Sequence, residues 1–385
     1  MSKRASVLLA VTVYNGRTLV SRCLESAKHI QSELADVDVL VLDDCSPEGG
    51  FSEFLRETCK RIDVNFYRSP RNLGIVRNVN LGLLSAVQND YDYVIISNSD
   101  VVYSRQTVDH LIEAARTDAR IGSVTAWSNN VSIYSIPNAA PDLHLSSQEV
   151  VDWLAASLAG PFRRSAVDIP AGISFCILIP TQVVRDVGLM DPAFGRGYCE
   201  ETDWSLRSLE RGYRICLAPA AFVYHQGRGS TLAAGMVSGG HTTVPANEAL
   251  IDFRYPLFRS QVDAFVHGGI RDELWRSALQ CIIRDAGKQF DYRVGMDGFV
   301  ADGSGDAVQV LSWGPPSGSV RASFRGFEAL IPVGPEPFGS IRSFFGTDPK
   351  KVWLADRPML TRELGQRALA GPSHPSTSPF YPARI

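Results

Sequence analysis

Three acidic residues stand close together in the segment YCEETDWSLRSLERGYR, residues 198–214: Glu200, Glu201 and Asp203. The residues that follow have the apolar spacing of a short helix, and Gly212 is placed to end it. Acids are common at a helix start because they interact favourably with the helix dipole. The segment therefore offers either a helix cap or carboxylates that exchange protons with a substrate. The local sequence does not decide between the two.

Polar residues also follow three apolar runs that are typical of buried strands, SVLLAVTVY (6–14), DVDVLVLDD (36–44) and YDYVIISNSD (91–100). In a parallel sheet, ligands bind outside the carboxyl ends of the strands. Carboxylates at that edge suit a divalent cation that neutralises a diphosphate, and Asp100 is the natural ligand. The alternative is that Asn98, Ser99 and Asp100 only cap a turn.

His225 ends another predicted strand, residues 213–225, and a glycine-rich stretch with Arg228 follows it. A lone histidine at such a position is more often a structural hydrogen-bonding group than a metal ligand. Beside Arg228, whose planar fork matches phosphate oxygens, it suits a second metal ligand next to a diphosphate clamp. The stretch is too long for a tight turn, and we expect residues 226–245 to form a mobile loop that closes over a bound donor.

The elements that must position these residues alternate between strands and helices of ten or more residues over the first half of the chain. This pattern predicts βαβ units, and hence an α/β fold with a mostly parallel sheet flanked by helices. No GxGxxG follows the first strand and no GxxxxGK[ST] occurs, so a dinucleotide or Walker-type site is not expected. A helical region over about 247–287 precedes a glycine-rich segment, about 289–345, that we expect to contain strands.

The composition of the 385 residues is that of a soluble globular protein, with 45% hydrophobic and 21% charged residues. A net charge of -3 gives no reason to expect nucleic acid as a partner. The seven cysteines are scattered without a CxxC pair, which argues against a zinc site and a disulfide framework. The apolar N-terminal run lacks a convincing cleavage site, and no run approaches a membrane span. We therefore expect a cytoplasmic protein, with peripheral contact to the inner face of the membrane left open.

The chain resembles the family 2 glycosyltransferases through an ordered set of motifs over about residues 5–232: VTVYNG, VLDDCS, RNLGIVRNVNLG, NSDV, GLMDPAFGRGYCEETDWSLR and VYHQGRGS. The subgroup that looks closest includes bacterial rhamnosyl- and galactofuranosyltransferases of surface-polysaccharide synthesis. The resemblance implies a Rossmann-like GT-A fold over 1–245, a smaller α+β C-terminal extension of unknown role over 246–370, and an extended or disordered tail over 371–385. It implies an inverting, metal-dependent transfer from a UDP- or dTDP-linked sugar to a hydroxyl of a glycan or glycolipid.

Carried over by position, the resemblance assigns three groups of residues. Asp100 and His225 would hold Mn²⁺ or Mg²⁺. Glu201 falls at the position of the catalytic base, with Glu200 and Asp203 beside it. The donor nucleotide and sugar would be bound by Thr12, Tyr14, Asn15, Asp43, Asp44, Arg77, Asn78, Asn98, Ser99 and Arg228.

Two departures from the family pattern keep alternatives open. Asn98 stands where the family has the first Asp of its DxD motif, which removes one carboxylate from the metal site. Glu201 is one methylene longer than the usual Asp, so Glu200 is an alternative base. The competing functions are a nucleotidyltransferase, which would need a glycine-rich basic loop after the first strand, and a non-catalytic carbohydrate-binding protein with a decayed site. Decay would be indicated by the loss of the acids, Asp100 and His225, all of which are present.

Overall fold

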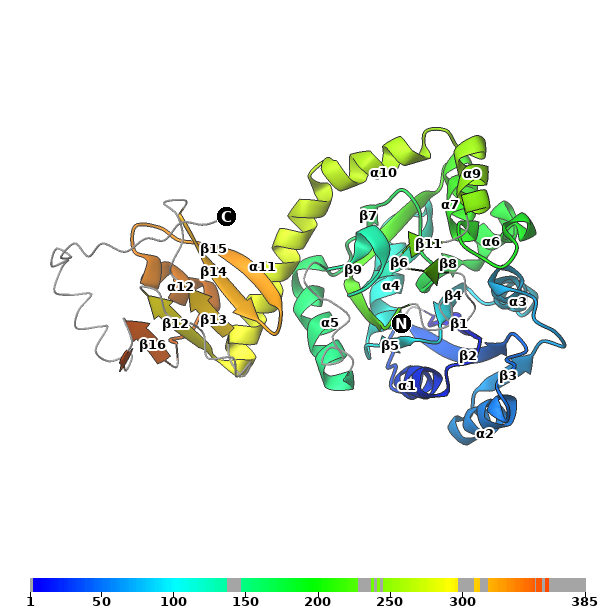
Figure 1. The fold of residues 1–385 in the computed structure, drawn as a ribbon, viewed down its shortest axis with the longest axis horizontal. Coiled ribbons are helices and arrows are strands. Elements are labelled where there is room, and N and C mark those ends of the chain that lie inside the picture. The colour runs from blue at the N-terminus through cyan, green and yellow to red at the C-terminus, as the bar shows by residue number, and fades with distance from the viewer. Residues whose placement is uncertain are drawn as a thin grey trace. The chain divides into compact units, whose positions relative to one another are not determined.

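The fold is that of a computed structural model, drawn in Figure 1, which describes residues 3–136, 147–227, 237–238, 241–242, 245–296, 308–311, 318–349, 351–354 and 357–359. The chain divides into two compact units, Met1–Ile282 and Ile283–Ile385. The division lies downstream of residue 245, the boundary expected from the sequence. The tail predicted over 371–385 lies outside the described residues.

A nine-stranded sheet in the order β3-β2-β1-β4-β8-β6-β9-β5, with β7 paired to β9, forms the centre of the first unit. Its strands are β1 (Ala5–Val13), β2 (Ala35–Asp43), β3 (Asn65–Arg68), β4 (Tyr93–Asn98), β5 (Val101–Tyr103), β6 (Ile121–Trp127), β7 (Val167–Asp168), β8 (Cys176–Pro180) and β9 (Arg214–His225). Strands β3, β2, β1 and β4 are mutually parallel, as are β6 and β9, whereas β8 is antiparallel to both of its neighbours. The predicted α/β class with a mostly parallel sheet is confirmed.

Helices flank this sheet (Figure 1): α1 (Arg17–Lys28), α2 (Phe51–Ile62), α3 (Ile75–Gln88), α4 (Thr107–Ala115), α5 (Gln148–Phe162), α6 (Thr181–Val187) and α7 (Glu200–Glu210). Helix α3 packs closely on β1 and β4 because Gly82 has no side chain at the contact. A Cβ atom there would lie 2.8 Å from Cβ of Ala10 and 3.1 Å from Cδ1 of Ile96. This close approach fixes the start of α3 relative to the carboxyl ends of the strands.

The helical region predicted over 247–287 is three helices, α9 (Pro245–Arg254), α10 (Phe258–His267) and α11 (Ile270–Phe290). Pro256 follows α9, and a residue before proline is disfavoured in helical conformation. Gly269, with φ of 87°, separates α10 from α11. Strand β5, helix α5 and the short turns η1 (Ser132–Tyr134) and η3 (Pro192–Phe194) carry patterns too short or too irregular to have been predicted.

The second unit contains a six-stranded sheet in the order β15-β14-β13-β12-β16-β17. Its elements are β12 (Tyr292–Met296), β13 (Val308–Leu311), β14 (Ser319–Phe324), β15 (Phe327–Pro332), α12 (Pro337–Phe345), β16 (Lys351–Leu354) and β17 (Arg357–Met359). The rings of Tyr292 and Phe345 stack with centroids 4.0 Å apart and join α12 to the sheet. The strands expected in this segment are therefore present.

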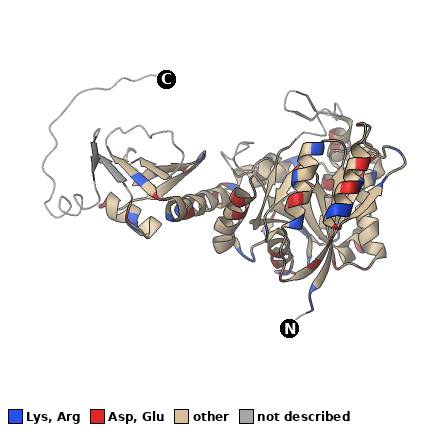
Figure 2. Cartoon of the chain, turned by 90° about the horizontal axis from the view of Figure 1, so that it is seen from below, with Lys and Arg blue, Asp and Glu red and all other residues tan. Residues whose placement is uncertain are grey.

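Positions of Lys or Arg and of Asp or Glu are interspersed along the helices (Figure 2), and the net charge of the chain is -3. Among the described residues, no helix combines the length and the apolar character needed to cross a bilayer. A two-stranded ribbon, β10 (Val237–Ser238) with β11 (His241–Thr242), completes the first unit.

Candidate active site

The carboxyl ends of β2, β1 and β4 lie side by side, because the three strands are parallel neighbours in the sheet. In the strand register, Thr12 is opposite Asn98 on one side and Leu42 on the other, and Val13 is opposite Asp43. The polar residues that end these three apolar runs are thus brought to one edge, as the sequence predicted.

Asp43 is fully buried at the end of β2. Its Oδ1 accepts hydrogen bonds from the backbone N–H and the hydroxyl of Ser46, at 3.0 and 2.6 Å. Its Oδ2 lies 3.5 Å from Nη1 of Arg68 and has no hydrogen-bond partner among the described residues. One carboxylate oxygen beside a partly exposed guanidinium is therefore left to accept a hydrogen bond from a ligand.

Asp44 holds the loop that leads into α3. Its two oxygens accept hydrogen bonds from the backbone N–H groups of Leu73 and Gly74, at 2.7 and 2.9 Å. Burial raises the pKa of this carboxyl above its ordinary value, and the two backbone hydrogen bonds oppose the rise. Asp44 therefore fixes the backbone of the loop before α3.

Three further residues assigned to donor binding lie at the end of β1 or directly after it, and they differ from one another in burial and in hydrogen bonding. Thr12 is buried and its hydroxyl donates to the backbone oxygen of Ser97, at 3.2 Å. Asn15 has φ of 59° and donates its backbone N–H to Ser46, at 2.8 Å. Tyr14 between them is partly exposed.

Four residues assigned to donor binding lie on α3 and at the end of β4. Some of them are buried in structural contacts and others are accessible to a ligand. Asn78 is buried and its amide donates to the backbone oxygen of Leu42, at 3.0 Å, which ties α3 to β2. Arg77, its neighbour, is exposed. Asn98 is partly exposed and Ser99 is buried. Arg77 and Asn98 are thus more accessible to a ligand than Asn78.

Asp100 and His225 meet because β5 pairs antiparallel with β9, with Val101 opposite His225. Nε2 of His225 lies 3.3 Å from Oδ1 of Asp100. Burial favours the uncharged form of both groups, but each group is stabilised by the other. As a net result the pKa of Asp100 is lowered and that of His225 is raised.

Two asparagines after β6 orient His225. Its Nδ1 lies 2.8 Å from the backbone oxygen of Asn130, so Nδ1 carries the proton. Asn129 accepts from the backbone N–H of His225 and donates to its oxygen, at 2.8 and 3.1 Å. The Nε2 atom consequently points toward Asp100 with its lone pair free whenever the ring is neutral.

The carboxylate oxygen of Asp100 and the Nε2 atom of His225 are suited to bind a divalent cation. Nε2 is buried and has no hydrogen bond of acceptable geometry among the described residues, although a carboxylate oxygen faces it. Imidazole and carboxylate together suit Mn²⁺. The described residues contain no group of three His, Cys, Asp or Glu side chains around one point. A cation held by this pair would need oxygen ligands from water or phosphate.

Glu200 and Glu201 begin α7 directly after two residues in left-handed conformation, Tyr198 with φ of 71° and Cys199 with φ of 72°. Burial and the neighbouring Glu201 raise the pKa of Glu200 well above its ordinary value. Burial also raises the pKa of Glu201, but hydrogen bonds from its own backbone, Glu200 and the backbone of Ser174 oppose the rise. Burial therefore favours retention of a proton by this pair of carboxyl groups.

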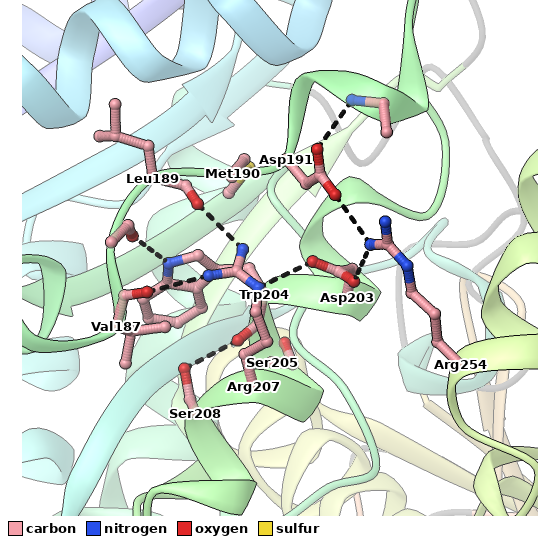
Figure 3. Close-up of polar contacts among 12 residues, drawn as sticks. Val187, Leu189, Met190, Asp191, Asp203, Trp204, Ser205, Arg207, Ser208 and Arg254 are labelled. Atoms are coloured by element: carbon pink, nitrogen blue, oxygen red, sulfur yellow. Dashed lines mark hydrogen bonds and ion pairs between the residues drawn. The ribbon is translucent and has the colours of Figure 1, made fainter.

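Asp203 has a different environment from the two glutamates (Figure 3). It is fully buried, and its Oδ2 accepts from Nε of Arg207 at 2.8 Å. Its Oδ1 accepts from Arg254 of α9 at 2.7 Å. The same oxygen accepts from the hydroxyl of Tyr255 at 3.0 Å. Arg207 also donates to the backbone oxygens of Val187 and Leu189. Both oxygens of Asp203 are occupied by cations, so its contacts are those of a structural carboxylate.

Ser174 and Phe175 connect the acid pair with the Asp100–His225 pair. The backbone of Ser174 hydrogen-bonds Glu201. The oxygen of Phe175 accepts from the backbone N–H of Asn98 at 2.9 Å, and its ring lies 5.2 Å from that of His225. The two sets of functional groups thus lie on either side of a two-residue segment.

The acid pair is also close to the loop held by Asp44. A Cβ atom on Gly74 would lie 3.1 Å from the oxygen of Gly195, and one on Gly197 would lie 2.2 Å from Cγ2 of Ile75. The backbone before Glu200 therefore packs on the start of α3. Arg228 and most of the loop predicted over 226–245 lie outside the described residues.

Sequence reasoning missed Arg68, Ser174, Phe175 and the pair Asn129–Asn130. Asn129 and Asn130 follow the apolar strand β6, so the rule that polar residues at strand ends form the site could have found them. Arg68 ends β3 in the same way. Ser174 and Phe175 act through backbone groups and a ring contact, for which the sequence carries no signal.

The first part of the chain matches a known protein family. Residues 9–176, from β1 to the start of β8, match the family described as Glycosyl transferase family 2. No curated protein matches the chain significantly. The matched range includes the strand ends and Asp100 but neither the acid pair nor His225.

Three solved structures that are similar to this chain are distant from it in sequence. One is GalNAc-T7 with UDP, GalNAc and Mn²⁺, with 17% identity, 58% of this chain and 44% of that chain covered, and a TM-score of 0.45. Another is the mannosyltransferase PcManGT from Pyrobaculum calidifontis with GDP-Man and Mn²⁺, with 14% identity, 72% and 75% covered, and a TM-score of 0.46. A third is S. aureus TarS 1–349, with 14% identity, 73% and 80% covered, and a TM-score of 0.43.

These likenesses assign no substrate or metal to this chain, which spans less than half of GalNAc-T7. The family match rests on residues 9–176, which contain the strand ends of the site. The chain carries a glycosyl transferase family 2 domain over residues 9–176.

Proposed function

We propose that the protein is an inverting, metal-dependent glycosyltransferase. It moves a sugar from a UDP- or dTDP-linked donor to a hydroxyl of a glycan or glycolipid acceptor. The observation that carries the proposal is the short link through Ser174 and Phe175 between the Asp100–His225 pair and the Glu200–Glu201 pair. A leaving diphosphate and an attacking hydroxyl need a cation site and a base on opposite sides of one sugar.

The donor nucleotide would bind at the ends of β1 and β2. The free Oδ2 of Asp43 is suited to accept a hydrogen bond from a base or ribose, with Arg68 beside it. Thr12, Tyr14 and Asn15 would complete that pocket. Arg77 and Asn98 would approach the sugar or the diphosphate, and Arg228 would clamp the diphosphate.

Asp100 and His225 would hold Mn²⁺ or Mg²⁺. When bound, the cation would neutralise charge on the departing nucleoside diphosphate. The hydrogen bond from Nδ1 to Asn130 holds His225 with Nε2 toward Asp100, which supports its role as a ligand.

Glu201 would be the base that takes the proton from the acceptor hydroxyl. Hydrogen bonds from Glu200 and from the backbone of Ser174 favour its ionised form. Glu200 would remain protonated and donate to Glu201. The raised pKa of Glu201 supports this role, because a base is most effective when its pKa approaches the working pH. By the family resemblance, the reaction would serve cell-envelope polysaccharide synthesis in the cytoplasm.

A thermal-shift panel tests the proposal directly. UDP-glucose, UDP-galactose, dTDP-rhamnose and GDP-mannose are each added with and without Mn²⁺ or Mg²⁺ to the intact chain and to the Asp100→Asn variant. A donor at about 100 times its Kd stabilises a protein by roughly 2.7 kcal/mol. We expect one nucleotide class to raise the Tm of the wild type only with metal, and the metal-dependent part to disappear in Asp100→Asn. If no nucleotide sugar stabilises the wild type with either metal, the proposal is wrong.

The stereochemistry is tested by proton NMR of the sugar released when water replaces the acceptor. We expect the first product to have the anomeric configuration opposite to that of the donor. Retention of configuration would overturn the assignment of Glu201 as a base, because a base-assisted single displacement inverts the anomeric carbon.

A further inference from the structure

Asn247, on helix α9, lies against the segment that leads into the acid pair. Its Nδ2 lies 2.9 Å from the backbone oxygen of Phe194, 2.9 Å from that of Gly197 and 3.0 Å from that of Tyr198. The side chain is buried. A primary amide has two N–H donors, so three carbonyl oxygens share both protons of this one group.

The segment that Asn247 contacts has an unfavourable backbone conformation. Gly195 has φ of 63°, Gly197 has φ of 126°, and Tyr198 and Cys199 have φ of 71° and 72°. Left-handed backbone is unfavourable for residues with a Cβ atom, and it persists only where the surroundings hold it. Carbonyl groups in such a segment do not point along a helix or a strand ladder, so they need donors from elsewhere.

The other end of α9 is attached to the same region. Nη1 of Arg254 lies 2.8 Å from Oδ2 of Asp191 and 2.7 Å from Oδ1 of Asp203, and its guanidinium carbon lies 5.5 Å from the ring centroid of Phe194. Helix α9 thus contacts both the segment before Glu200 and helix α7 itself. It lies beyond residues 9–176, and the sequence analysis assigned it no role.

We propose that Asn247 is a positioning residue that sets the direction of the Glu200–Glu201 pair by fixing the backbone of residues 194–198. This inference rests on the proposed function, because it assumes that the pair acts on the acceptor hydroxyl. The amide is suited to this position since it offers donors without a charge. A carboxylate would face three carbonyl oxygens with no proton to share, and an apolar side chain would remove the donor that these oxygens share in a buried place.

The test compares Asn247→Ala and Asn247→Ser with the wild type in the intact chain. Serine keeps one donor and serves as the milder change if the alanine variant folds poorly. Asp252→Asn is the matched control, because Asp252 lies on the same helix and pairs only with the exposed Arg259 among the described residues.

Hydrogen exchange followed by mass spectrometry gives a readout that needs no substrate. We expect peptides covering 194–203 to exchange at least about 10-fold faster in Asn247→Ala, with a smaller increase in Asn247→Ser and none in Asp252→Asn. Peptides of β1 and β4 should be unchanged in all three. Unchanged exchange over 194–203 in Asn247→Ala would overturn the inference, as would uniformly faster exchange across the whole first unit.

The second readout is donor hydrolysis, measured as release of nucleoside diphosphate from UDP-glucose, UDP-galactose and dTDP-rhamnose with Mn²⁺. A displacement of about 1 Å at a reacting group can lower a rate about 100-fold. We expect kcat to fall about 10- to 100-fold in Asn247→Ala while donor KM changes less than about twofold. Equal changes in kcat and KM would contradict a positioning role. If the wild type hydrolyses none of the donors, the proposed function fails, whereas the exchange result still judges the contact of Asn247.

Discussion

Replacing Asp203 with Asn separates a structural carboxylate from a catalytic one. Asp203 has no exposed surface and accepts three hydrogen bonds from side chains, at 2.8 Å from Arg207, 2.7 Å from Arg254 and 3.0 Å from Tyr255. An asparagine keeps one oxygen but presents an NH₂ group to the other arginine. The variant therefore loses one charge-assisted hydrogen bond and weakens two contacts.

The expected loss of stability follows from these contacts. A hydrogen bond to a charged group contributes about 1.5–3 kcal/mol, and breaking a buried ion pair costs about 3–5 kcal/mol. The arginine side chains are 23% and 31% exposed, so water recovers part of their solvation and the lower part of the range applies. We expect a loss of about 2–4 kcal/mol. In a unit of this size, 1 kcal/mol lowers Tm by roughly 2–4 °C, which gives a decrease of about 4–16 °C.

Differential scanning fluorimetry of the intact chain measures this decrease, and nucleoside diphosphate release at a temperature well below Tm measures activity. The control is Asp252→Asn on α9, whose exposed ion pair with Arg259 should leave Tm unchanged within about 1 °C. For Asp203→Asn we expect a lower Tm and a kcat within about threefold of wild type. A normal Tm with turnover lowered 100-fold would show that Asp203 belongs to the chemistry, and the structural reasoning would fail.

Three further predictions concern the segment before α7 and the acid pair. Glu201→Gln should lower kcat by about 10²–10⁴ because the general base is lost. Glu200→Gln resembles the protonated acid, so its kcat should stay within about 10-fold of wild type. If a donor-hydrolysis assay gives the reverse order of the two variants, Glu200 is the base. Glu200→Gln should also change the pH dependence of stability. Burial raises the pKa of Glu200 in the folded state, so the folded chain keeps a proton that the unfolded chain releases, and wild-type stability falls as pH rises above the ordinary glutamate pKa. The Tm of the variant relative to wild type should therefore increase from pH 5 to pH 8, and a constant difference would contradict the raised pKa. Gly197→Ala should lower both Tm and kcat, because its Cβ would lie 2.2 Å from Cγ2 of Ile75 and its φ of 126° disfavours a side chain. Adding Ile75→Ala should restore part of the Tm by removing the steric clash, and no recovery would mean that backbone strain alone accounts for the loss.

The strand ends of the site were predictable because they depend on local patterns. Continuous apolar runs predict buried parallel strands, and parallel neighbours place their carboxyl ends at one edge whatever the details of packing. Asp43, Asn98 and Asp100 were found in this way. The meeting of Asp100 with His225 was predicted only through the order of motifs, since the pairing of β5 with β9 joins strands that are distant in the sequence.

The roles of the three acids could not be predicted from their spacing. Glu200, Glu201 and Asp203 are nearly adjacent, yet successive residues of a helix point about 100° apart and meet different neighbours. Asp203 meets two arginines, one of which comes from α9, whereas Glu200 and Glu201 face each other and the backbone of Ser174. Their relative proton affinities depend on burial and partners, which are properties of the folded chain.

The sequence alone determined the α/β class, the parallel strands and the polar residues at their ends, because hydrophobic periodicity and turn chemistry act over a few residues. The tertiary structure decided which carboxylates are neutralised by cations, which remain as an acid pair, and that the amide of Asn247 holds the backbone before them. Such contacts join residues far apart along the chain. Their energies depend on distance and burial, which no local pattern of residues records.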